Sequence, residues 1–117
     1  MKTHKDLIVW QKSLDFVTTI YSITDKFPKS EQYGLSNQIR RATVLIPSNI
    51  AEGSARNHNK EFVQFLYIAL SSASEIDTQL RISKNLKFIE KEKSKELLEE
   101  LESISKMLQG LIRSIKQ

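Results

Sequence analysis

The sequence predicts an all-α protein, an antiparallel up-down-up-down four-helix bundle in a single domain that spans residues 1–117. Apolar residues recur at intervals of three and four in four stretches, the spacing that places them on one face of a helix. The stretches have similar lengths and are separated by short breaks, which favours antiparallel neighbours. The chain also has only three glycines and two prolines, too few turn-forming residues for a set of β-hairpins.

The first stretch runs from Leu7 to Thr24, and Asp6 is its predicted N-cap. The Phe27–Pro28 pair ends this helix, because proline disfavours α geometry in the residue before it. We expect the core face of this helix to consist of Leu7, Trp10, Leu14, Val17, Tyr21 and Thr24. On this interpretation Trp10 is a core residue, and a platform for stacking bases is the alternative.

The second helix begins near Ser30 or Ser36 and ends at Gly53, where we expect the positive φ of a helix C-terminus. Pro47 removes one helical hydrogen bond and should kink the helix. Asn49 should be a buried, hydrogen-bonded amide on the core face. The predicted core face is Leu35, Ile39, Ala42, Ile46, Asn49 and Gly53.

The third helix opens at Asn57 or Asn59, and the fourth begins between Glu90 and Ser94. Early glutamates and late basic residues in the fourth stretch suit the dipole of a helix. The third core face is Phe62, Phe65, Ala69, Ser72, Ile76 and Ser83, and the fourth is Leu97, Leu101, Ile104, Leu108, Leu111 and Ile115.

The second and third helices carry more apolar residues than one core face needs. A helix of a monomeric bundle requires an apolar face of little more than 100°. The additional residues are Val44, Leu45, Pro47, Ile50 and Ala51 in the second helix, and Val63, Leu66, Leu70, Ala73 and Leu80 in the third. We therefore expect a homo-oligomer whose interface covers the excess, with a deeply buried central hairpin as the alternative. A head-to-tail ring lets two different faces meet and still close.

Composition and motifs exclude several classes of function. The chain has no cysteine, which removes disulfides and thiolate metal sites. Neither of its two histidines, His4 and His58, follows a glutamate by three residues, as di-iron bundles require. No glycine-rich phosphate loop or nucleophile elbow is present. The longest apolar run, residues 65–70, is far shorter than the roughly 20 residues of a membrane span. We predict no enzymatic activity, metal, cofactor or membrane partner, and a cytoplasmic location.

Positive charge concentrates at the two ends of the predicted bundle. The net charge is +4, which leans toward polyanionic partners. The end with the first and third connections carries a net charge of +3, from four carboxylates and the seven lysines Lys26, Lys29, Lys84, Lys87, Lys91, Lys93 and Lys95. The other end, with Arg56 and Lys60, also carries +3. Repeated around an oligomer, each end becomes a basic ring that contacts phosphates without reading sequence. Simple solvation of the lysine tips is the alternative.

Two arginines and one glutamate of the second helix need partners. If the chain folds back around residues 54–58, Arg40 and Arg41 lie opposite Glu75 and Asp77. Structural ion pairs and a polyanion site are both open interpretations, because guanidinium suits both. Glu52 lies at a helix C-terminus, where the helix dipole disfavours negative charge. We expect Arg56, or the free N–H groups of the next helix, to offset the charge of Glu52.

Several motifs along the chain resemble a known family. Residues 46–53 read Ile-Pro-Ser-Asn-Ile-Ala-Glu-Gly, after Gln-Ile-Arg-Arg-Ala at 38–42 and before Lys-Glu-Phe-Val-Gln-Phe-Leu at 60–66. The start, Asp-Leu-Ile-Val-Trp-Gln-Lys at 6–12, and the end, Met-Leu-Gln-Gly-Leu-Ile at 107–112, match as well. The order resembles the four-helix bundle proteins encoded in intervening sequences of bacterial 23S ribosomal RNA genes. It is also similar to their relatives, the accessory variability proteins of diversity-generating retroelements.

This resemblance implies a homopentameric barrel of four-helix bundles with no established enzyme activity. In the retroelement branch it also implies nucleic-acid binding and partnership with a reverse transcriptase. The arginine pair of the family corresponds to Arg40 and Arg41, and its turn arginine to Arg56.

The leading hypothesis is a non-enzymatic, oligomeric protein that binds RNA through basic surfaces with little sequence readout. The candidate contacts are Lys26, Lys29, Arg40, Arg41, Arg56, Lys60, Lys84 and Lys87. Pro47, Asn49, Glu52 and Gly53 form a structural motif. The alternative is an assembly protein whose partner is another protein, for example a reverse transcriptase.

Overall fold

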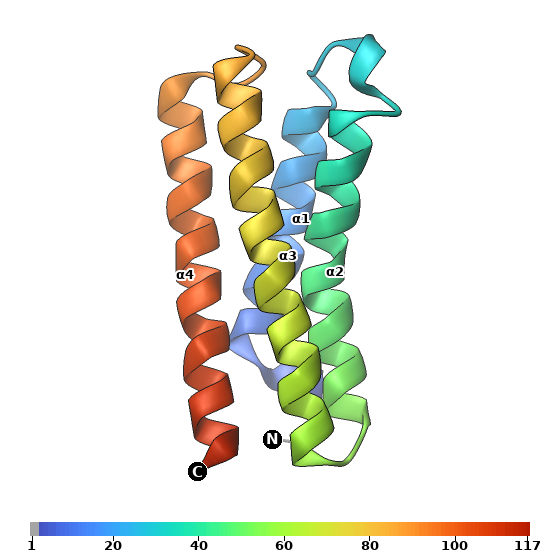
Figure 1. Cartoon of the computed structure of the whole chain (residues 1–117), viewed down its shortest axis with the longest axis vertical. Coiled ribbons are helices and arrows are strands. Elements are labelled where there is room, and N and C mark those ends of the chain that lie inside the picture. Colours follow the sequence, from blue (N-terminus) through green and yellow to red (C-terminus); the bar gives the residue numbers. More distant parts are fainter. Residues whose placement is uncertain (1–2) are drawn as a thin grey trace.

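A computed structural model describes residues 3–117, which form four long helices and no strand. The helices are α1 (Ile8–Thr24), α2 (Leu35–Ala55), α3 (Asn59–Asn85) and α4 (Lys91–Lys116), and two short 3₁₀ turns are η1 (His4–Asp6) and η2 (Lys29–Glu31). Figure 1 shows the helices side by side, with the α1–α2 and α3–α4 connections at one end and the α2–α3 connection at the other. The predicted all-α fold with four helices is confirmed. None of the helices within residues 3–117 is long and apolar enough to cross a bilayer.

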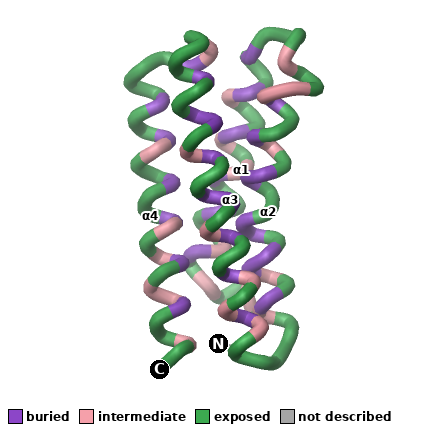
Figure 2. The backbone as a smooth tube through the Cα atoms, viewed as in Figure 1, coloured by how far each residue is buried: buried purple, intermediate pink, exposed green. Residues whose placement is uncertain are grey.

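The core lies along the inner face of all four helices (Figure 2). Its fully buried side chains include Ile20 of α1, Ile46 of α2, Leu66 of α3 and Leu108 of α4. The contact between α2 and α3 is the most extensive and that between α1 and α4 the least. The bundle is therefore built around the α2–α3 hairpin, with α1 packed on α2 and α4 packed on α3.

The predicted core face of α1 is only partly right: Thr24 is buried and Leu7 and Trp10 pack against the core, but the centre of the buried face is shifted by about one residue. Leu14 and Tyr21 were expected in the core, but they are 40% and 43% exposed. The buried face consists instead of Val9, Ser13, Phe16, Ile20 and Thr24. Both stripes are largely apolar and lie about 100° apart on the helix. The stripe that contains Phe16 and Ile20 turns inward, because the way α2 and α4 pack against α1 decides between the two.

Two predicted helix starts also differ from the structure. Asp6 does not cap α1, because its carboxylate accepts a hydrogen bond from the Thr3 N–H (3.2 Å) within the short η1 turn. Neither Ser30 nor Ser36 opens α2: the first lies in η2 and the second is buried inside the helix. Glu31 instead satisfies a free N–H group at the start of α2, since its Oε1 accepts a hydrogen bond from the Leu35 N–H at 3.1 Å. The predicted starts of α3 at Asn59 and of α4 between residues 90 and 94 are confirmed.

Gly53 is not the end of α2, and the expectation of a positive φ there is wrong. The helix continues to Ala55, and none of the glycines in residues 3–117 has a positive φ. The left-handed residue of this turn is Asn57, with φ of 57°. A Cβ added to Gly53 would lie 2.7 Å from the Cβ of Phe65 and 3.0 Å from the Cδ1 of Phe62. The position needs glycine because α3 crosses α2 too closely for any side chain.

The rest of the motif in α2 is buried. Pro47 lies inside the helix and is buried, and its kink stays a prediction. Asn49 is 7% exposed, and its Nδ2 donates to the Leu45 carbonyl at 2.7 Å. The expectation of a buried, hydrogen-bonded amide is thus confirmed.

The apolar excess is smaller than expected on α3 and is shared with α1. Three members of the second α3 stripe, Leu66, Ala73 and Leu80, belong to the core. Seven large apolar side chains of α1, α2 and α3 nevertheless remain 37–48% exposed, namely Leu14, Tyr21, Val44, Leu45, Tyr67, Ile68 and Ile82. We call these residues the outer apolar set. No residue of α4 belongs to it.

Candidate nucleic-acid interface

The connection between α1 and α2 and that between α3 and α4 meet at one end of the bundle (Figure 1). Phe27, from the first connection, is 6% exposed, and its ring lies 5.4 Å from the ring of Phe88 in the second. Each phenylalanine directly follows a lysine, Lys26 and Lys87. Since the contact between the buried Phe27 ring and the partly buried Phe88 ring joins the two connections, the two lysines extend from neighbouring points at the surface.

This lysine end is defined by four residues that the sequence analysis named, Lys26, Lys29, Lys84 and Lys87, all of which are exposed. Lys87 has a left-handed backbone (φ 66°), and its N–H donates to the Lys84 carbonyl at 2.9 Å, which closes the end of α3. The four ion pairs found within residues 3–117 include none of these lysines. Their ammonium groups are therefore available to an anionic ligand.

Arg40 has a structural role between α1 and α2. Its Nε donates to Thr24 Oγ1 at 2.7 Å, and its Nη2 donates to the Tyr21 carbonyl at 3.3 Å. The guanidinium also lies 4.6 Å from the centre of the Tyr21 ring. These contacts use Nε and one N–H of Nη2 to hold Arg40 against α1, and its role in binding stays a prediction.

The expected pairing of Arg40 and Arg41 with acidic residues of α3 is wrong. Asp77 instead accepts from Arg81 Nε at 2.7 Å, and Glu75 accepts from Gln79 Nε2 at 3.1 Å. Both acids use partners one turn away on α3, because residues four apart on a helix are neighbours. Arg41 is exposed and takes part in none of the ion pairs in the described part of the chain.

At the opposite end, Arg56 is held by two contacts. Its Nη2 lies 3.4 Å from Glu52 Oε1, and its guanidinium lies 5.0 Å from the centre of the Phe65 ring. The expectation that Arg56 offsets the charge of Glu52 is confirmed. Lys60 is exposed in the first turn of α3. The opposite end therefore offers Lys60 and a partly occupied Arg56, and its exposed Lys5, Arg113 and Lys116 also take part in none of the ion pairs of the described residues.

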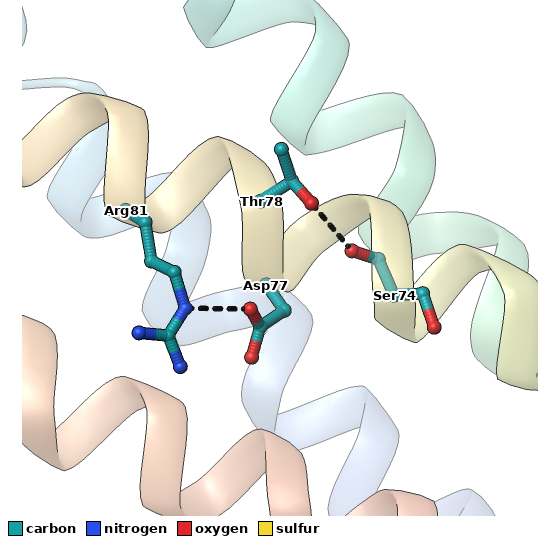
Figure 3. A network of polar contacts seen from close by, with 4 residues as sticks. All are labelled: Ser74, Asp77, Thr78 and Arg81. Carbon is teal, nitrogen blue, oxygen red and sulfur yellow. Dashed lines mark hydrogen bonds and ion pairs between the residues drawn. The ribbon is translucent and has the colours of Figure 1, made fainter.

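A surface groove between α3 and α4 was not anticipated from the sequence. It opens toward the lysine end, and its walls include Asp77, Arg81 and Lys84 of α3 and Lys91 and Lys95 of α4. Figure 3 shows Arg81 extending from α3 toward α4 with its Nε on Asp77. The hydrogen bond and the charge of Asp77 raise the pKa of Arg81 above its usual value. The signal in the sequence was the four-residue spacing of Asp77 and Arg81, typical of an ion pair on one helix.

Within residues 3–117, no three His, Cys, Asp or Glu side chains are grouped in a way that could hold a metal ion.

Comparisons with known proteins agree on one family. The family model described as 23S rRNA-intervening sequence protein matches residues 5–110. No curated protein matches the sequence. A solved structure with the same fold is a protein with unknown function from the S23 ribosomal protein family of Bacteroides thetaiotaomicron VPI-5482. It is 26% identical, with a TM-score of 0.84, and the match covers 91% of this chain and 96% of that one.

Proposed function

This chain belongs to the family of 23S rRNA-intervening sequence proteins, and from that premise we propose that it is a non-enzymatic, oligomeric protein of the cytoplasm that binds RNA. The lysine end is the proposed contact surface. The observation that supports it most is the contact between Phe27 and Phe88, which brings two lysine-bearing connections together.

The chemistry of the lysine end favours the RNA backbone over the bases. An ammonium group on a flexible stem is a point charge that accepts many phosphate positions, whereas base readout requires a fixed pattern of donors and acceptors. Lys26, Lys29, Lys84 and Lys87 provide charge without such a pattern. Binding should therefore depend strongly on salt and weakly on sequence.

We expect replacement of Lys26 and Lys29 by glutamine to lower the affinity for a structured RNA about tenfold at low salt. Loss of two phosphate contacts should also reduce the slope of log K against log salt by roughly 1.5. The measurement is fluorescence anisotropy with a labelled RNA hairpin at several salt concentrations.

The matched control is Lys12→Gln with Lys106→Gln. It removes the same charge from exposed positions on the sides of α1 and α4, and Lys106 already pairs with Glu102 at 3.4 Å. An equal loss of affinity in both double variants would contradict the assignment to the lysine end. Absence of any binding by the unchanged protein at low salt would rule out the RNA-binding function.

We further propose that the outer apolar set forms the interface between copies of this chain. These seven side chains lie on α1, α2 and α3, while the exposed face of α4 lacks such residues. Two different apolar faces can join copies head to tail into a closed ring. Five copies is the number implied by the resemblance to the accessory variability proteins. A ring would place one lysine end beside the next and multiply its charge.

Light scattering should give a mass several times the 13.5 kDa of the chain, independent of concentration in the micromolar range. Leu45→Glu with Ile68→Glu should reduce the mass toward that of one chain, because two buried carboxylates would lose their hydration without a partner. Gln109→Glu with Ser114→Glu, on the exposed face of α4, adds the same charge and should leave the mass unchanged. If light scattering showed that the unchanged protein is a monomer, the result would contradict the ring.

A protein partner is the second candidate function, and the same outer apolar set supports it. If the chain is monomeric, seven exposed apolar side chains remain for another protein to cover. By resemblance that partner would be a reverse transcriptase. Light scattering of the unchanged protein therefore decides whether the outer apolar set binds other copies of this chain or a different protein.

A further inference from the structure

The groove between α3 and α4 combines positive charge from both of its walls. Arg81 and Lys84 belong to α3, and Lys91 and Lys95 belong to α4. None of the three lysines takes part in an ion pair within residues 3–117. Asp77 is the only acidic residue on the α3 wall of the groove. On the α4 wall, Glu99 and Glu102 lie beyond Lys95, away from the lysine end, and Glu102 pairs with Lys106 at 3.4 Å. The half of the groove nearest the lysine end is therefore cationic.

Arg81 is oriented for a ligand by Asp77. Its Nε donates to Asp77 Oδ1 at 2.7 Å, and its two Nη groups make no hydrogen bond to the described residues. Figure 3 shows these groups on the side facing α4. A guanidinium held at Nε still presents two N–H donors in a fixed fork, which matches two oxygens of a phosphate.

Ser94 provides an independent observation in the same groove. It is 1% exposed, and its Oγ has no hydrogen-bond partner in the described part of the chain. Two other buried serines do form hydrogen bonds within their own helices. Ser13 Oγ donates to the Trp10 carbonyl and Ser83 Oγ donates to the Gln79 carbonyl, each at 2.8 Å. Ser94 lies in the first turns of α4, where the Glu90 carbonyl already accepts from the Ser94 N–H at 2.9 Å. A buried hydroxyl without a partner is rare enough to require an explanation.

The start of α4 adds a weaker positive charge to the groove, from the dipole of the helix. The N-cap residue, Glu90, makes no side-chain hydrogen bond to the first N–H groups of the helix. The positive end of the helix dipole lies next to Lys91, on the wall of the groove, with the carboxylate of Glu92 in the same first turn.

We propose that this groove binds one phosphate group, with the Arg81 fork and the lysines as its cationic ligands and the Ser94 hydroxyl, which is closed to solvent until its side chain rotates toward the groove, as a further donor from the floor. The identification of the phosphate as part of the RNA backbone rests on the function proposed above. The site itself would also accept a free phosphate, and the experiment separates the two sources.

The first arm titrates the ¹⁵N-labelled protein with inorganic phosphate and follows amide chemical shifts by NMR, with chloride at equal ionic strength as the reference. The resonances of Arg81 and of residues 91–95 should shift and saturate with phosphate alone. Arg81→Gln should weaken the affinity about tenfold, the loss of a charge-assisted pair of hydrogen bonds. Ser94→Ala should weaken it about fivefold, the loss of one hydrogen bond to a phosphate oxygen.

Two control variants lie outside the cationic half of the groove. Ser105→Ala makes the same change near its acidic end, and Arg113→Gln removes an exposed arginine from the last turn of α4. Both should leave the phosphate affinity unchanged. Circular dichroism melts of all four variants should be recorded to check that each variant is folded. Equal effects of Ser94→Ala and Ser105→Ala, or no saturable shifts, would overturn the phosphate site.

The second arm measures RNA affinity for the same variants. A tenfold loss in Arg81→Gln, with none in Arg113→Gln, supports an RNA phosphate in the groove. RNA affinity that is the same in both variants, together with phosphate binding in the first arm, would overturn the RNA assignment and identify a free phosphate as the ligand. If RNA does not bind at all, the proposed function is lost, whereas the first arm still decides whether the groove is a phosphate site.

Discussion

Gly53→Ala is expected to destabilise the protein by about 2 kcal/mol or more, although alanine is the better helix former. In the middle of a helix the change from glycine to alanine contributes about 0.5–1 kcal/mol of stability when space is available. At Gly53 the new Cβ would lie 2.7 Å from the Cβ of Phe65, and both atoms are fixed to the backbone. Separating α2 from α3 to relieve this overlap costs about 1–3 kcal/mol or more, as in other overpacked cores.

Gly110→Ala is the matched control and should change stability in the opposite direction. Gly110 also lies inside a helix, but its added Cβ would meet only Arg113 Nη2, at 3.8 Å. We expect it to raise the free energy of unfolding by about 0.5–1 kcal/mol. In a domain of this size 1 kcal/mol moves Tm by about 4 °C, so thermal melts resolve both changes. A Gly53→Ala protein that melts at or above the unchanged protein would show that the two helices can separate freely.

A third variant distinguishes close packing from a backbone requirement at Gly53. Asparagine tolerates the left-handed conformation better than other residues with a side chain. If Gly53 were present for a positive φ, Gly53→Asn would be milder than Gly53→Ala. Since Gly53 is helical and crowded by Phe62 and Phe65, Gly53→Asn should be the more damaging of the two.

Phe16→Ala is expected to cost about 3–5 kcal/mol, the range for removal of a buried aromatic ring. Phe16 is 2% exposed and packs on the core face of α1. Domains typically have 5–15 kcal/mol of stability in total, so the variant should melt far below the unchanged protein or fail to fold. Urea unfolding at fixed protein concentration measures the loss.

Leu14→Ala tests the orientation of α1, because Leu14 belongs to the core face that the sequence predicted. Leu14 is 40% exposed, so its replacement should cost about 1 kcal/mol or less in the isolated bundle. A larger loss for Leu14→Ala than for Phe16→Ala would restore the core face predicted from the sequence and contradict the orientation of α1.

The sequence predicted the fold because its strongest patterns are local. On α2 the apolar positions at 39, 42 and 46 belong to the predicted inward face, and they are buried. On α1 two stripes compete, and the choice between them depends on how α2 and α4 approach, which no local pattern records. Gly53 is similar: glycine suggests a helix end, but the reason for it is the close approach of Phe65 and Phe62 on another helix.

The candidate site was also predictable in part: the sequence predicted which lysines lie together, but not the contacts between helices. The clustering of Lys26, Lys29, Lys84 and Lys87 follows from topology alone, because the connections after α1 and α3 share one end. The role of Arg40 was not predictable, since its partners lie 16 and 19 residues away on α1. The unpaired hydroxyl of Ser94 is likewise visible only once the neighbours of α4 are placed.

The contact between Phe27 and Phe88 has a consequence for the energetics of binding. It joins the α1–α2 hairpin to the α3–α4 hairpin across 61 positions of sequence, so the lysine end exists only while the two hairpins are docked. A ligand that bridges lysines from both connections must then bind the docked state alone. By thermodynamic linkage it would stabilise docking by RT ln(1 + [L]/Kd). The α1–α4 contact is the least extensive between neighbouring helices, so a local parting of α1 from α4 is the opening that such a ligand suppresses most, and hydrogen exchange in α1 should slow as RNA is added.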